Sequence, residues 1–307
     1  MQFVKNYFLI IVLVLLVLFF SLQTNNFFSL ITLSTILSQL PALTFVAVGM
    51  TLVLIVGGID LSVGSLMALC SAVIGILIVQ SGLSFTLAIF CGLSLVCIVG
   101  AASGYLSSYL KLPSFIVTLG VLEAARGLAY VISDSQTMYV GASVQGLTDP
   151  IDGIGISIMM LLAFAVVIVA HGMLNYTVFG RQLIAIGSNK KAALMSGITP
   201  DPRVLVVFVI SASLAGLAGL ANLSYLGSSD PNAGIGLELS AIAAAVIGGT
   251  SLMGGRGTVL GTFIGVLIIA VLDSGLAQMG MSEPAKRIIT GAVIVMAVLL
   301  DKWRAKH

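Results

Sequence analysis

The chain has 307 residues, of which 59% are hydrophobic and only 8% are charged, and its formal net charge is +2. A soluble domain of this length needs roughly a quarter of its residues charged to cover its surface. The mean hydropathy is +1.20. Water-soluble globular classes are therefore excluded, most of the surface must contact membrane lipid, and the charge distribution indicates no nucleic-acid partner.

Cysteine and histidine usage argues against metal chemistry. Cys70, Cys91 and Cys97 all lie in apolar runs, where cysteine usually behaves as a small buried hydrophobe. The chain has two histidines, His171 and His307. The sequence therefore predicts no disulfide, no metal site and no metal-dependent enzyme.

Apolar runs broken at glycine, proline and charge predict an all-α polytopic protein with about ten membrane spans, since about 20 apolar residues cross a bilayer core as a helix. We expect the spans near residues 8–22, 41–57, 61–80, 85–108, 113–131, 153–173, 204–224, 237–253, 257–279 and 287–301. The first span lacks a small-x-small cleavage site, so we expect an uncleaved helix rather than a signal peptide. The apolar stretch 28–40 either lies in the membrane interface or extends the second span.

Basic residues fix the expected orientation, because cytoplasmic loops of membrane proteins are enriched in lysine and arginine. With the N-terminus in the cytoplasm, ten of the 13 basic residues lie inside: Lys5, Lys111, Arg181, Lys190, Lys191, Arg203, Arg256, Lys302, Arg304 and Lys306. Lys286 and Arg287 then lie outside. Both termini are expected to be cytoplasmic, and residues 1–307 form one membrane domain with an outer loop at 132–152 and an inner loop at 174–203.

A glycine-rich motif at residues 57–65, GGIDLSVGS, separates the second and third expected spans. A glycine pair can end one helix, and Asp60 or Ser62 can cap the next. The plainer interpretation is a tight turn in which Asp60 is only a cap. The functional interpretation is a broken helix beside a transport route, because irregular backbone within a membrane must line a cavity or be buried in protein. The candidate route residues here are Gly57, Gly58, Asp60, Ser62 and Ser65.

A second stretch at residues 248–256, GGTSLMGGR, fits the same pattern, Gly-Gly-x-[Asp/Ser]-Leu-x-x-Gly, 191 residues later. Paired elements of this kind indicate a possible internal repeat, although a chain with 34 glycines also produces such matches by chance. Gly248, Gly249 and Thr250 join the candidate route, together with Asn222 near the outer end of the seventh span. The stretch lacks the lysine of a phosphate-binding loop, so we expect no nucleotide site on this chain.

Glu123 and Arg126 lie three residues apart in the fifth expected span, and therefore on one helix face. An unpaired charge at mid-membrane costs about 2.5–3.5 kcal/mol, so the sequence predicts a structural ion pair between them. Asp273 and Gln278, in the outer half of the ninth span, are expected to make hydrogen bonds between helices rather than to contact a substrate.

The inner loop contains a predicted short helix. Ser188 or Asn189 can cap its start, and Gly197 stands where a C′ glycine belongs. Ala192, Ala193 and Leu194 give it an apolar side. Because a helix of about two turns is marginal alone in water, we expect it to pack on its own membrane domain or on a partner.

These motifs together resemble the ribose-type permease family of bacterial ABC importers. The matching pieces are 48–53 (VGMTLV) with the motif at 57–65, Gly180-Arg181 with 185–187 (AIG) and 196–198 (SGI), and 241–252, within a likeness that spans about residues 40–300. The resemblance implies a multi-pass permease of the bacterial inner membrane, paired with a second permease copy or a related permease. It also implies a periplasmic sugar-binding protein that delivers a monosaccharide, and a cytoplasmic ATPase that binds ATP-Mg. This chain itself would be no enzyme and would bind no cofactor.

The same resemblance implies that the inner loop is a coupling helix that docks in the ATPase, with candidate residues Arg181, Gly187, Ser188, Asn189, Ala192, Ala193, Leu194 and Gly197. Ser188, Lys190 and Lys191 stand where relatives usually have glycine, acidic or alanine residues, which leaves the identity of the ATPase open. The alternative function is a stand-alone, ion-coupled secondary carrier of a small polar solute. Such carriers use titratable acids within the membrane, and Asp273 is the candidate once Glu123 is assigned to Arg126.

Overall fold

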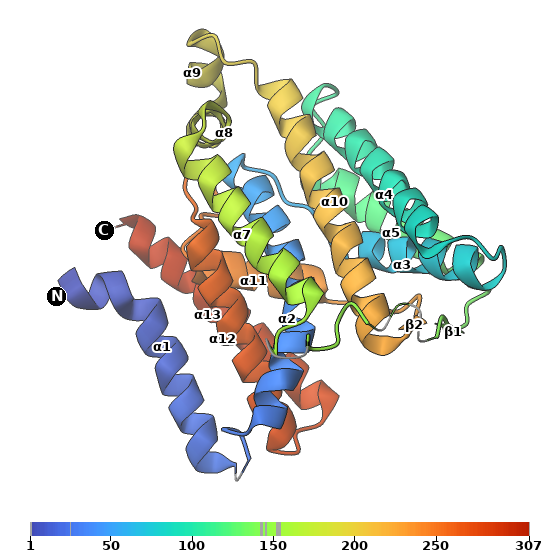
Figure 1. Ribbon diagram of the computed structural model, residues 1–307. Helices are drawn as coiled ribbons and strands as arrows, with labels where there is room; N and C mark the ends of the chain where they lie inside the picture. The colour runs from blue at the N-terminus through green and yellow to red at the C-terminus, as the bar shows by residue number, and fades with distance from the viewer. Residues whose placement is uncertain (1, 25, 142–143, 145, 152–154, 307) are drawn as a thin grey trace.

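The computed structural model describes residues 2–24, 26–141, 144, 146–151 and 155–306 and is helical almost throughout (Figure 1). Its helices are α1 (Gln2–Gln23), α2 (Leu30–Ile55), α3 (Val63–Val79), α4 (Phe85–Ser108), α5 (Ser114–Ile132), α7 (Ile158–Tyr176), α8 (Val178–Ser188), α9 (Lys190–Met195), α10 (Pro200–Leu226), α11 (Leu237–Ile247), α12 (Val259–Gln278) and α13 (Glu283–Lys306). Two short strands, β1 (Met138–Tyr139) and β2 (Ser228–Ser229), pair antiparallel with Met138 opposite Ser229.

Six of the described helices are long and apolar enough to cross a membrane: α2, α4, α5, α7, α10 and α12. Phe8–Gln23 of α1, α3 and α11 are shorter apolar helices. The all-α polytopic class is therefore confirmed. Each of the ten expected spans overlaps one helix, but ten membrane crossings stay a prediction.

The structure decides one helix boundary that the sequence left open and corrects another. The stretch 28–40 extends the second span, because α2 begins after Ser29, whose hydroxyl accepts a hydrogen bond from the N–H of Thr32, and continues through Pro41. The eighth expected span, 237–253, was too long: α11 ends at Ile247, and an irregular segment follows as far as Thr258. With 11 residues, α11 is about 16 Å long, which is half of a bilayer core.

The second half of α2 forms the centre of the molecule, since every residue from Phe45 to Ile55 is buried. It packs against α7, α10, α11 and α12. On the far side of α10, glycines let α4 approach closely: a Cβ added at Gly104 would lie 2.8 Å from the Cα of Leu205. Small residues permit such close packing between membrane helices.

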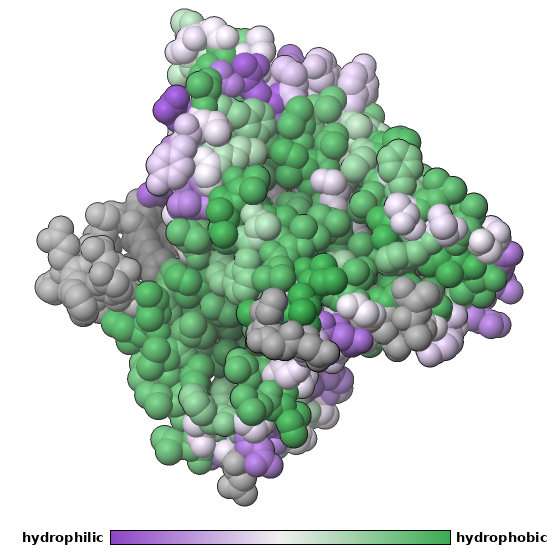
Figure 2. All heavy atoms as spheres, in the orientation of Figure 1, coloured by the Kyte–Doolittle hydropathy of each residue, from purple (hydrophilic) through white to green (hydrophobic). Residues whose placement is uncertain are grey.

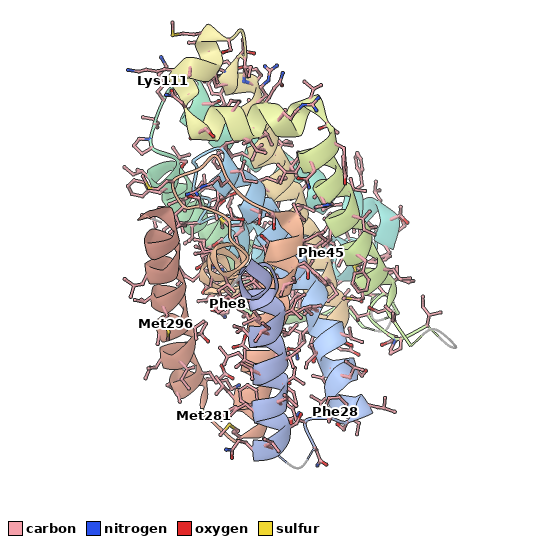
Figure 3. All side chains as sticks on the ribbon, turned by 90° about the vertical axis from the view of Figure 1, so that its left-hand side faces the viewer. Phe8, Phe28, Phe45, Lys111, Met281 and Met296 are labelled. Atoms are coloured by element: carbon pink, nitrogen blue, oxygen red, sulfur yellow. The ribbon has the colours of Figure 1, made fainter. Side chains whose placement is uncertain are left out.

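Hydrophilic side chains gather at the α8–α9 end and at the opposite end, with hydrophobic side chains between them (Figure 2). Large exposed apolar side chains include Phe90 of α4 and Ile168 of α7. Lys111 lies at the α8–α9 end, whereas Phe28 and Met281 lie at the other (Figure 3). The expected distribution of the basic residues, the positions of the termini and which end faces the cytoplasm stay predictions. Of the predicted outer loop, residues 142–143, 145 and 152 lie outside the described residues.

Candidate transport route and coupling surface

The motif at 57–65 breaks the chain between α2 and α3. The N–H of Gly57 donates to the carbonyl of Leu54, and the N–H of Gly58 donates to that of Val53, both at 2.9 Å. Gly57 has φ +79°, the left-handed conformation that closes a helix C-terminus in this pattern. Two helices therefore meet here through an irregular segment, residues 56–62, in which Gly58, Asp60 and Ser62 are buried and Gly57 is exposed.

Asp60 connects this segment to α10 and does not simply cap α3. Its side chain is 2% exposed. One carboxylate oxygen accepts hydrogen bonds from the N–H (3.0 Å) and hydroxyl (2.6 Å) of Ser62, and the other accepts one from the Ser211 hydroxyl (2.9 Å). Ser62 occupies the N-cap position of α3, but its hydroxyl makes no cap bond to that helix. The Asp60 carboxylate therefore fixes the position of the break relative to α10.

Two hydroxyls at the start of α5 hold the other side of the same segment. Ser114 accepts a hydrogen bond from the N–H of Ile59 (3.0 Å). Thr118 accepts one from the N–H of Leu61 (3.1 Å) and donates to the carbonyl of Ile59 (3.2 Å). Sequence analysis missed these residues, although their i, i+4 spacing puts both on one helix face. Nothing in the spacing says which segment that face meets.

The stretch at 248–256 ends α11 in the same way. The N–H of Gly249 donates to Val246 and the N–H of Thr250 donates to Ala245, both at 2.9 Å, with φ +91° at Gly249. In this geometry Gly249, not Gly248, corresponds to Gly57. The predicted repeat is thus out of register by one residue with respect to the two helix ends, and it stays a prediction.

The predicted ion pair between Glu123 and Arg126 is absent from the salt bridges of the described residues, which are Lys190–Asp201 and Lys286–Glu283. Arg126 instead donates to the carbonyl oxygens of Pro231 (2.5 Å) and Ala233 (2.8 Å). The guanidinium thus fixes the segment between β2 and α11 to α5. Backbone carbonyls compete for this arginine because the irregular segment exposes them within its reach.

The inner loop folds into α8 and α9, with the predicted cap at Asn189. Its side-chain oxygen accepts hydrogen bonds from the N–H groups of Lys191 (3.1 Å) and Ala192 (3.0 Å). Gly197 has φ +80°, as a C′ glycine requires. The capped helix spans six residues, and the preceding helix α8 was not predicted. Gln182 of α8 accepts a hydrogen bond from Arg203 of α10 at 2.7 Å, which fixes the loop to the membrane domain.

The end of α8 lies directly on both helix breaks. The N–H of Gly255 donates to the carbonyl of Ile55 at 2.9 Å, which joins the segment after α11 to the end of α2. A Cβ added at Gly187 would lie 1.7 Å from that carbonyl oxygen and 2.5 Å from the Gly255 nitrogen. Gly187 therefore faces its own membrane domain, and the prediction that it contacts a partner does not fit its position.

The remaining predicted coupling residues divide between core and surface. Ala193 is buried, whereas Arg181, Ser188, Asn189, Ala192, Leu194 and Gly197 are exposed. Leu194 is 59% exposed and the neighbouring Met195 is 90% exposed. The helix therefore packs on its own domain through Ala193 and presents an apolar tip to the outside.

A cavity of about 990 Å³ opens at the opposite end of the molecule. It lies between the first half of α2, the end of α10, the start of α11, the second half of α12 and the start of α13. Its polar lining comes from Thr32, Thr35, Ser38, Gln39, Asn222, Tyr225, Ser240, Asp273, Ser274, Gln278, Glu283, Lys286, Arg287 and Thr290. We refer to it as the outer cavity. At its mouth Lys286 donates to Glu283 (2.5 Å), which holds the pKa of that carboxyl below its usual range.

Of the predicted route residues, Asn222 lines the outer cavity. Gly57 and Gly58 line a separate cavity of about 180 Å³ beside Ile186 and Lys190. Asp60, Ser62, Ser65 and Thr250 are buried, and Gly248 is packed against α12, since a Cβ there would lie 2.4 Å from Gly261. The structure therefore does not bring the predicted set together: one residue lies at the outer cavity and the others form or support the breaks. Sequence analysis missed Gln39 and Tyr225. It expected hydrogen bonds between helices for Asp273 and Gln278, and Gln278 of α12 does donate to Thr32 of α2 at 2.6 Å.

Comparison with known proteins gives consistent matches over most of the chain. Residues 32–298 match the family described as branched-chain amino acid transport system, permease component. The ribose import permease RbsC of Bacillus subtilis is 38% identical over 95% of this chain and 91% of its own length. The fructose import permease FrcC of Rhizobium meliloti is 32% identical over 97% and 85%, and the D-allose permease AlsC of Escherichia coli is 34% identical over 95% and 90%. No solved structure matches. The chain therefore belongs to the family of ABC-transporter permease components that includes these sugar permeases.

Proposed function

We propose that this chain is the membrane-spanning subunit of an ATP-driven importer that moves a monosaccharide across the bacterial inner membrane. The support comes from relatives named for import of ribose, fructose and allose, each similar over most of its length. A periplasmic binding protein delivers the sugar, a separate ATPase binds ATP-Mg, and a second permease copy or a related permease completes the membrane part.

The position of α8 and α9 is the structural observation that carries this proposal. A docking ATPase would contact the exposed tip formed by Leu194 and Met195. Force applied there reaches Gly187, which lies against Ile55 and Gly255 at the ends of both helix breaks. The coupling element thus contacts the two places where the membrane helices are interrupted.

The alternative is an ion-coupled secondary carrier, and one observation favours it. Such carriers use titratable acids within the membrane. Glu123 forms no ion pair within the described part of the chain, so it joins Asp273 as a candidate for coupling to an ion.

Reconstitution separates the two functions. The chain alone in liposomes should take up no ribose, fructose or allose under a proton or sodium gradient. Uptake should appear when the ATPase and the binding protein of the same importer are added with ATP. Gradient-driven uptake by the chain alone would establish the carrier instead.

A further inference from the structure

The outer cavity ends inside the membrane domain, at the start of the half-length helix α11. Residues 234–237 line it where α11 begins, and Ala221 and Ala270 line it from within the apolar helices α10 and α12. A solute that enters the cavity therefore leaves bulk water and meets fixed side chains. A largely apolar pocket with a few convergent polar groups is the usual form of a small-molecule site.

Asp273 is the carboxylate that lies deepest on α12. It precedes the end of this membrane-spanning helix by five residues, or about 8 Å at 1.5 Å per residue. Its side chain is exposed to the cavity. An ionisable group at this depth is costly unless water, a partner or a ligand solvates it. An ionised carboxylate offers about four acceptor positions, so Asp273 can accept hydrogen bonds from two neighbouring hydroxyls.

The side-chain amides that line the cavity differ in whether they already make hydrogen bonds within the protein. Gln278 donates to Thr32 at 2.6 Å, and Gln39 donates to the Tyr225 hydroxyl at 2.9 Å. Asn222 lines the cavity from α10, and its side chain makes no hydrogen bond within the described residues. An amide supplies both donors and an acceptor, so Asn222 can hydrogen-bond a hydroxyl of a ligand in the cavity.

Charge narrows the class of ligand. Lys286 is engaged by Glu283 at the mouth of the cavity, and Arg287 of α13 is a further basic side chain in its lining. Anionic solutes are repelled by a carboxylate, whereas neutral polyols donate hydroxyl protons to it. Apolar neighbours such as Leu40, Leu43 and Leu237 can pack against the C–H face of a sugar ring.

From these observations we infer that Asp273 and Asn222 form a binding site for a neutral sugar in the outer cavity, and that Asp273 selects against anionic sugar derivatives. This inference rests on the proposed function for the choice of sugars. It adds a contact made by the permease itself, distinct from any selection by a binding protein.

Protection of a cysteine in the cavity tests the inference on the purified full chain. In a cysteine-free background, Ser274→Cys places a thiol in the cavity next to Asp273. Ribose, fructose or allose should slow its reaction with a water-soluble maleimide, and gluconate should not. Adding Asp273→Asn should raise the half-protecting concentration about tenfold or more, since hydrogen bonds to a charged group are worth about 1.5–3 kcal/mol. Asn222→Ala should raise it less.

Asp134→Asn is the matched control, because it makes the same change at an exposed carboxylate that does not line the outer cavity. It should leave protection unchanged. Equal melting temperatures of Asp273→Asn and its parent would show that the fold is retained.

Several outcomes would overturn the inference. A thiol at 274 that does not react, protection by none of the three sugars, or protection unaffected by Asp273→Asn would each do so. If the reconstituted importer still carries sugar in those cases, the proposed function stands and only the sugar site is lost. If the importer carries none of the sugars, the proposed function fails separately.

Discussion

Replacement of Gly187 by alanine tests whether the coupling element depends on close contact with the two helix breaks. The added Cβ would lie 1.7 Å from the Ile55 carbonyl oxygen and 2.5 Å from the Gly255 nitrogen. Both atoms belong to backbone, and they are hydrogen-bonded to each other at 2.9 Å. No side-chain rotation relieves this overlap, so α8 must move away or the Gly255–Ile55 bond must break.

The cost follows from these two responses. Overpacking of a close-packed site costs about 1–3 kcal/mol, and a buried donor and acceptor left unpaired cost about 1–3 kcal/mol. We therefore expect Gly187→Ala to destabilise the folded chain by roughly 2–6 kcal/mol if the contact is kept. If α8 moves instead, the folded chain keeps its stability, and we expect more ATP to be hydrolysed for each sugar taken up.

Thermal unfolding of the purified chain and sugar uptake by the reconstituted importer measure the two responses. Gly172→Ala in α7 is the matched control, because a Cβ there meets no atom within 4 Å and alanine is the better helix former. The reasoning is refuted if Gly187→Ala equals Gly172→Ala in melting temperature, uptake and ATP hydrolysed per sugar.

Three further predictions follow from the contacts described above. Asp60→Ala should lower the free energy of unfolding by about 3 kcal/mol or more, because it leaves buried hydroxyls without their acceptor; a wild-type melting temperature would contradict this. Arg126→Gln should be clearly destabilising in thermal unfolding and Glu123→Gln should not, and the double variant should match Arg126→Gln. If the double variant instead recovers part of the lost stability, the two side chains interact and the ion-pair interpretation is supported. In intact cells and a cysteine-free background, Gln136→Cys should react with a membrane-impermeant thiol reagent and Met195→Cys should not; the reverse result would invert the orientation.

Sequence periodicity and composition located continuous helices well and interrupted ones less well. The span expected at 85–108 coincides with α4, because glycine or proline lies near each of its ends and the apolar run between them is unbroken. The span expected at 237–253 did not end where the helix does. Hydropathy continues through Leu252 and Met253, whereas the backbone leaves the helix at Gly248, where the left-handed Gly249 follows. An apolar run therefore reports burial, and only the glycine pair reports the helix end.

The chemistry of single residues could be predicted, but their partners could not. Asp60 was identified as unusual from its place after two glycines, yet its bond to Ser211 joins residues 151 positions apart. Arg126 was assigned to the nearest acid along its own helix. The structure gives it two carbonyls from an irregular segment, and such carbonyls have no signature in a sequence because every residue carries one.

The half-length helix α11 connects the outer cavity to the coupling surface. Its first residue, Leu237, lines the cavity, and the segment after its last residue, Ile247, is bonded through Gly255 to the end of α2. α11 lies in close contact with α12, because a Cβ at Gly265 would lie 2.1 Å from the carbonyl oxygen of Ala244. We therefore expect a displacement imposed at Gly255 to move α11 and α12 together, and with them the wall of the cavity that holds Asp273. Gly248 and Gly249 end α11, whereas Gly265 brings α12 against it. The proposed coupling along the roughly 16 Å of α11 depends on both features.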